Sequence, residues 1–168
     1  MNEIKKMQDN LLLIRRIVGW TAEEFGEKIG LTRQTINNIE SGRNKLSKTQ
    51  YIAMRSVLDA EIIKHPEDTE MLKIFLDVFI DNSDKYSEKA KKDLLEKFNL
   101  ISPSILAKTT TREVASNELL KYSKLILGSI AIGGIVGATS ILSKKLFNID
   151  SSWINKIIGN SNNMKGGK

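Results

Sequence analysis

The sequence predicts an all-α protein, and three observations support that fold class. Apolar residues recur every three or four positions along most of the chain, which is the period of an amphipathic helix. Glycine, proline and helix-capping residues divide these runs into segments of ordinary helix length. No stretch alternates between polar and apolar residues as a strand would. With 168 residues, the chain is long enough for one or two domains.

Residues 1–64 are predicted to form one unit of four or five short helices. A first apolar run covers 11–18 and ends at Gly19. Three later helices follow residues whose hydroxyl groups can cap a first turn: Thr21, Thr32 and Ser47, the last in a capping box with Gln50. Gly30 and Gly42 end two of these helices, and the His65-Pro66 pair closes the unit.

Residues 65–118 are expected to be a helical middle region that serves as a dimerisation unit or a spacer. A broad apolar face covers 71–79, and a second apolar run begins at Ser87. We expect this second run to break at 102–104, because Pro103 lacks the N–H donor of a helix interior and crowds the preceding turn.

Residues 22–41 have the pattern of two helices that meet at a steep angle through a short turn. Gly26 is a small residue where the helices would touch, and Gly30 tolerates the positive φ that such a turn needs. Apolar residues on both sides of the turn can pack the pair together: Phe25, Ile29, Leu31, Ile36 and Ile39. The spacing is typical of a helix-turn-helix.

The second helix of this pair separates into two faces. At 100° per residue, Ile36 and Ile39 point to one side. The other side carries four polar residues and no acid: Arg33, Gln34, Asn37 and Asn38. Arginine can bond guanine O6 and N7, and glutamine and asparagine can bond adenine N6 and N7. This face is therefore predicted to contact the bases of double-stranded DNA.

The stretch TAEEFGEKIGLTRQTINNIESGRN, residues 21–44, resembles the helix-turn-helix of the Cro/lambda-repressor-like regulators, the XRE family. The resemblance covers roughly residues 9–62. It implies a five-helix domain that binds operator DNA, usually as a homodimer on a two-fold symmetric site, with the second motif helix in the major groove. A transcription regulator, most simply a repressor, is the function that this resemblance implies.

The resemblance also implies roles for individual residues. Contacts to the DNA backbone are implied for Thr21, Thr32, Ser41, Arg43, Asn44 and Lys45. Ala22 departs from the glutamine often found at the start of the first motif helix, and that contact is expected to be lost. Arg15 and Glu40 match a pair that links the first and third helices in relatives, and we expect this pair to stabilise the fold.

Residues 119–147 are expected to form an apolar helix, and 148–168 an amphipathic or disordered tail. The run from Leu125 to Leu142 has no charge and is long enough to span about 27 Å, near the hydrocarbon thickness of ~30 Å. A face of small residues would suit helix–helix contact in a membrane: Ser129, Gly133 and Gly137. A transmembrane helix that anchors the protein at the inner face of the cytoplasmic membrane is predicted, and a buried helix or soluble interface is the alternative.

Composition narrows the remaining function classes. The absence of Cys excludes disulfides and thiol chemistry, and an N-terminus without an apolar core predicts a cytoplasmic protein. His65 is the only histidine, and we find no catalytic set, metal cluster or phosphate loop, so neither an enzyme nor a cofactor or metal is expected. The net charge of +6 suits DNA or anionic lipid. An antitoxin-like or membrane-attached protein-interaction module with an unknown partner remains the alternative.

Overall fold

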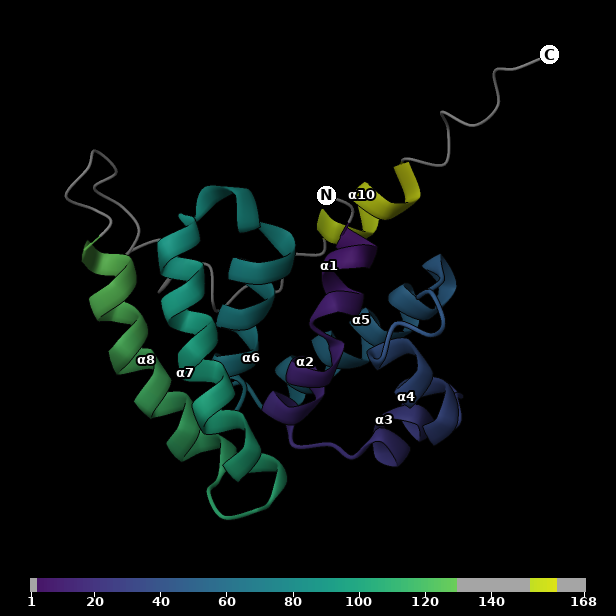
Figure 1. Ribbon diagram of the computed structural model, residues 1–168, viewed down its shortest axis with the longest axis horizontal. Coiled ribbons are helices and arrows are strands. Elements are labelled where there is room, and N and C mark those ends of the chain that lie inside the picture. Colours follow the sequence, from purple (N-terminus) through teal and green to yellow (C-terminus); the bar gives the residue numbers. More distant parts are fainter. Residues whose placement is uncertain (1–2, 130–151, 160–168) are drawn as a thin grey trace.

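A computed structural model describes residues 3–129 and 152–159, and every regular element in these two ranges is a helix (Figure 1). The elements are α1 (Glu3–Asp9), α2 (Leu11–Val18), α3 (Ala22–Ile29), α4 (Arg33–Glu40), α5 (Lys48–Lys64), α6 (Glu70–Phe75), the π-helical turn η1 (Leu76–Asp81), the 3-10 turn η2 (Ser83–Lys85), α7 (Glu88–Leu106), α8 (Arg112–Ser129) and α10 (Ser152–Gly159). The predicted all-α class is confirmed for this part of the chain.

Local signals in the sequence set the ends of the N-terminal helices. α3 begins at a capping box in which the Glu24 amide donates to Thr21 Oγ1 and the Thr21 amide donates to Glu24 Oε2. α5 begins at the predicted capping box of Ser47 and Gln50 and ends at Lys64, directly before His65. α4 ends at Glu40, two residues before Gly42. α2 to α5 correspond to the four runs that the sequence marks, and α1 is a further helix before them.

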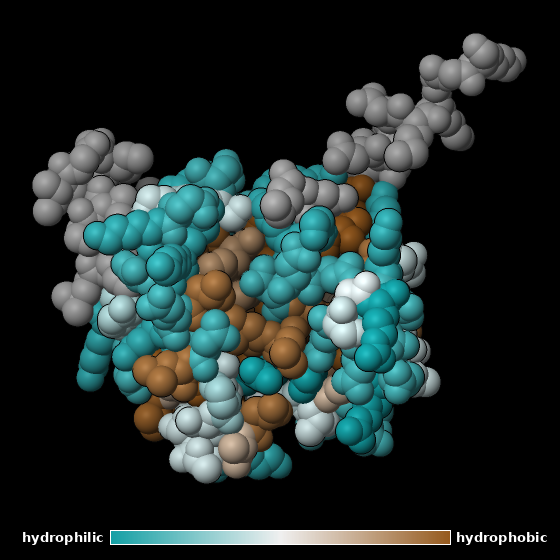
Figure 2. Space-filling view, in the orientation of Figure 1, coloured by the Kyte–Doolittle hydropathy of each residue, from teal (hydrophilic) through white to brown (hydrophobic). Residues whose placement is uncertain are grey.

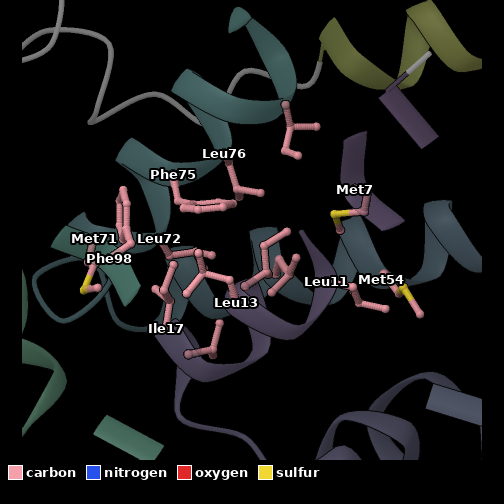
Figure 3. Packing of buried hydrophobic residues seen from close by; sticks show 14 of the residues in the cluster. Met7, Leu11, Leu13, Ile17, Met54, Met71, Leu72, Phe75, Leu76 and Phe98 are labelled. Carbon is pink, nitrogen blue, oxygen red and sulfur yellow. The ribbon is translucent and has the colours of Figure 1, made fainter. Parts of the chain in front are cut away.

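The middle region packs directly against the N-terminal helices. α2 lies along α7 and also contacts α6, while α1 contacts η1. Side chains from both regions form one hydrophobic cluster, in which Leu13 and Ile17 of α2 lie close to Leu72 of α6 and Phe98 of α7 (Figure 3). Phe75 packs edge-on against Phe98, with ring centroids 4.9 Å apart. Residues on both sides of position 65 therefore share a core.

The expected helix break at 102–104 is wrong. α7 runs through Pro103 and ends at Leu106, one turn later. Proline removes a single backbone hydrogen bond, and it lies here near the C-terminal end of the helix. Ile101 and Ile105 are buried on the side of α7 that packs on α2, and their burial offsets the loss.

The apolar run 125–142 lies mostly outside the described residues. Its first five positions end α8, whose last residue is Ser129, while Gly133 and Gly137 lie outside the described ranges. Among the helices of the described part, none combines the length and the apolar composition needed to cross a membrane. The predicted membrane helix and its small-residue face stay predictions.

α10 packs against the N-terminal domain. Trp153 and Ile157 are buried, the Trp153 indole N–H donates to Asp59 Oδ2 at 2.8 Å, and the indole meets Tyr51 edge-on. Arg55 lies over the same indole and bonds Asp81 on η1 with both terminal nitrogens, which joins α5, η1 and α10. Residues 152–159 of the predicted tail thus form a helix that packs against the protein.

Candidate nucleic-acid interface

α3 and α4 meet through a short turn in which two glycines serve different purposes. Gly30 has a φ of +72°, in the left-handed region that favours glycine, and the space beside its Cα is open. Gly26 lies inside α3, where an added Cβ would clash with the carbonyl oxygen of Leu31. The Leu31 amide donates to the Gly26 carbonyl at 2.8 Å, so the turn folds back onto α3. Conformation requires glycine at position 30, and close approach requires it at position 26.

α4 has one buried face and one accessible face. Ile36 and Ile39 are fully buried and hold the helix to the domain core. The opposite face carries the four residues predicted to contact bases: Arg33 and Gln34, which are exposed, and Asn37 and Asn38, which are partly exposed. In the view of Figure 2, the side of the molecule formed by α3 and α4 is mainly hydrophilic.

Hydrogen bonds organise this accessible face. The Thr32 hydroxyl accepts the Thr35 amide at 3.2 Å and so caps α4. The Gln34 side-chain amide donates to Asn38 Oδ1 at 3.0 Å, one helical turn along. This bond uses one Gln34 donor and one Asn38 acceptor, so the Gln34 side-chain oxygen and the Asn38 side-chain nitrogen remain as an acceptor and a donor of the pair. A paired donor and acceptor is the pattern that an adenine edge requires.

Arg15 and Glu40 form the ion pair that the resemblance implied. Arg15 Nε lies 2.6 Å from Glu40 Oε1, and Nη2 lies 3.0 Å from Oε2, so the pair is bidentate. Both side chains are more than nine-tenths buried. Arg15 Nη1 also donates to the Trp20 carbonyl at 2.9 Å, which ties the α2–α3 turn to the end of α4.

The loop after α4 exposes the side chains predicted to follow the DNA backbone: Ser41, Arg43, Asn44 and Lys45. Gln8 of α1 fixes this loop, although the sequence analysis did not identify it. Its amide donates to the Ile39 carbonyl at 3.0 Å and the Asn44 carbonyl at 2.7 Å, and its oxygen accepts the Leu46 amide at 2.9 Å. The sequence signal that could have identified Gln8 is its position beside Met7, because an uncharged polar residue on the apolar side of a short helix needs hydrogen-bond partners within the protein.

Residues 11–63 match a family model described as helix-turn-helix. The N-terminal part of the chain is an XRE-type helix-turn-helix domain. Domains of this family occur in DNA-binding transcription regulators, and this assignment supports DNA binding by the chain. No curated protein and no solved structure matches the chain.

A recess opens on the helix-turn-helix domain where the start of α3 faces α4. Residues of four helices and a turn line it: Arg15, Thr21, Ala22, Glu23, Arg33, Asn37 and Leu106. Ala22 is buried and has no side-chain donor. Leu106 is the last residue of α7, so the middle region reaches the face that carries Arg33 and Asn37.

The first turn of α3 is acidic. Glu23 and Glu24 are both exposed there, next to Thr21. The Thr21 amide and hydroxyl hydrogen bonds lower the pKa of Glu24, and the nearby charges of Lys108 and Lys28 lower it further. Glu24 is therefore ionised at neutral pH. A DNA phosphate beside Thr21 would meet two negative side chains, and a cation in the same place would offset them.

Proposed function

We propose that this protein is a sequence-specific transcription repressor of the cytoplasm that binds a two-fold symmetric operator as a homodimer. The observation that supports it best is the accessible face of α4, where Arg33, Gln34, Asn37 and Asn38 project from a helix that Ile36 and Ile39 bury on the other side. Such a face can enter the major groove while the fold stays intact.

The residues proposed to contact DNA divide into those that contact bases and those that contact the backbone. Arg33 suits guanine, and the three amide side chains of α4 suit adenine. The backbone contacts are proposed at the helix starts and in the exposed loop: Thr21, Thr32, Ser41, Arg43, Asn44 and Lys45. A protein bound at an operator within a promoter would block the binding of RNA polymerase, and transcription would be repressed.

In vitro selection of random duplexes by the full chain tests the proposal. A palindromic motif should be enriched, and Asn37→Ala should alter the motif with a loss of about 1–3 kcal/mol for the original site. Asn117→Ala is the matched control, because it makes the same change at an exposed position of α8. Enrichment of no duplex would overturn the proposal and favour a protein-interaction module, and an unchanged motif for Asn37→Ala would overturn the base contact.

Membrane attachment through 125–142 is constrained by α10. A single crossing places the chain before it and the chain after it on opposite sides of a membrane. α10 follows the run, and its Trp153 bonds Asp59 of α5 within the DNA-binding domain. We propose that α10 stays docked in the DNA-binding form, with both ends of the run on one side of the membrane.

The chain has no Cys, so single introduced cysteines can report the side on which each position lies. Lys45→Cys and Asn155→Cys place thiols at exposed positions of the DNA-binding domain and of α10. A membrane-impermeant maleimide should modify both only after cell lysis. Modification of position 155 alone in intact cells would show a crossing and overturn this topology.

A further inference from the structure

The loop between α7 and α8, Ala107–Thr111, lies beside the DNA-binding face although it is far from the helix-turn-helix domain in the sequence. Figure 1 shows it at the same end of the molecule as α3. Its sequence, Ala-Lys-Thr-Thr-Thr, contains one cation and no acid. Leu106, directly before it, lines the recess that Thr21 and Arg33 also line.

Contacts on both sides of the loop fix its position. Ile105 packs against the α2–α3 turn so closely that a Cβ on Gly19 would lie 3.2 Å from Ile105 Cγ2. Arg112, directly after the loop, pairs with Glu61 of α5 at 2.5 Å. The amides of Thr109 and Thr110 both donate to the Ser104 carbonyl. The loop is thus held against the DNA-binding domain.

Lys108 has an unusual backbone conformation. Its φ is +57°, and among the described residues it is the one non-glycine residue with a positive φ. It follows the last residues of α7, at a position where glycine commonly ends a helix. The Cβ of a lysine disfavours this conformation, and a glycine would allow the same turn without that cost. The turn alone therefore does not explain why a cation lies at this position.

The Lys108 amine is available to a ligand. Its residue is exposed, and within residues 3–129 and 152–159 no hydrogen bond or ion pair engages the amine. It lies near enough to the start of α3 for its charge to act on Glu24. Because Leu106 lines the same recess as Thr21 and Ile105 packs on the α2–α3 turn, the loop brings an exposed cation to the side of the domain where α3 begins.

We propose that the Ala107–Thr111 loop is a second DNA-backbone contact, in which Lys108 neutralises one phosphate per protomer beside the start of α3. This contact rests on the proposed function and extends it beyond residues 11–63. Lys108 offsets the repulsion from Glu23 and Glu24, and it supplies a donor where Ala22 has none.

Salt dependence of binding tests the contact, because each neutralised phosphate releases condensed counterions. The probe is the duplex selected by the full chain, and its dissociation constant is measured over a series of salt concentrations. Lys108→Asn removes the charge and keeps a residue that tolerates positive φ. Its slope of log K against log salt should be shallower by ~0.9 per protomer, with equal loss for all sequences.

Two further variants separate charge from conformation. Lys108→Arg should retain the wild-type slope, and Lys108→Gly should lose it while the protein stays as thermostable as the wild type. Lys92→Asn, at an exposed position of α7, is the matched control and should change nothing. An unchanged slope for Lys108→Asn, with selection of a motif intact, would overturn this contact alone. Failure of the wild-type chain to select any duplex would instead overturn the proposed function.

Discussion

The buried pair of Arg15 and Glu40 predicts a large effect on stability and none on the DNA sequence that is read. Two nitrogen–oxygen distances of 2.6 and 3.0 Å join side chains that are 9% and 8% exposed. Glu40→Ala leaves the guanidinium buried with the Trp20 carbonyl as its partner. Loss of one partner of such a pair costs about 3–5 kcal/mol, a large part of the ~5–15 kcal/mol that stabilises a typical domain.

Replacement of both partners should cost much less. In the double variant Arg15→Met with Glu40→Leu no charge is left buried, and apolar side chains of similar volume are often neutral in place of an ion pair. The Trp20 carbonyl loses its donor, which costs about 1–3 kcal/mol if water does not replace it. The double variant should therefore be more stable than Glu40→Ala.

Urea denaturation of Glu40→Ala and of the double variant measures this difference. Glu27→Ala, at an exposed position of α3, is the control for the loss of a carboxylate and should stay within about 0.5 kcal/mol of the wild type. The motif selected by the folded fraction of Glu40→Ala should be that of the wild type. A loss below about 1 kcal/mol for Glu40→Ala, or a changed motif, would contradict a structural role for the pair.

Three other predictions follow from the same geometry. Gly26→Ala should destabilise the domain in thermal denaturation by more than Gly30→Ala, since the first creates a clash with backbone and the second only a strained φ of about 1–2 kcal/mol; the reverse order would contradict the assigned roles. Gln8→Leu should weaken DNA binding equally for all sequences in a mobility-shift titration, because the loop loses three hydrogen bonds; a changed motif would argue against this. The wild type should have a larger free energy of unfolding than Glu24→Gln at pH 7. This difference should decline as the pH falls below about 4.5, since the folded-state pKa of Glu24 lies under its ordinary value of 4.5.

Local signals explain how much of the N-terminal domain could be predicted from the sequence. The caps at Thr21, Thr32 and Ser47 and the left-handed Gly30 act within a few residues, so the sequence contains the whole interaction. The separation of α4 into two faces follows from the helical period and the buried isoleucines.

Long-range packing explains what could not be predicted. Pro103 is tolerated because α7 is buried along α2, about ninety residues away in the chain. Gln8 bonds backbone groups at positions 39, 44 and 46, which no spacing in the sequence indicates. The Ala107–Thr111 loop reaches the helix-turn-helix domain because Ile105 packs on the α2–α3 turn and Arg112 pairs with Glu61, and no spacing in the sequence indicates these contacts.

The family model ends at residue 63, but the packing of α2 indicates that the folding unit is larger. α2 has two buried sides: Leu11 lies toward Met54 of the N-terminal domain, whereas Leu13 and Ile17 lie toward Leu72 and Phe98 of the middle region (Figure 3). In a fragment of residues 1–64 the second side would meet water. Exposure of two such side chains costs about 3–6 kcal/mol, comparable to the total stability of many small domains.

The fragment 1–64 should consequently unfold at a much lower temperature than the full chain, or associate through the exposed side of α2. Leu13→Lys with Ile17→Lys should improve the solubility of the fragment and unfold the full chain, because the same two positions are surface in one and core in the other. A fragment as stable as the full chain would contradict this. The helix-turn-helix domain is then one half of a fold whose other half both completes its core and brings the Lys108 loop to the DNA-binding face.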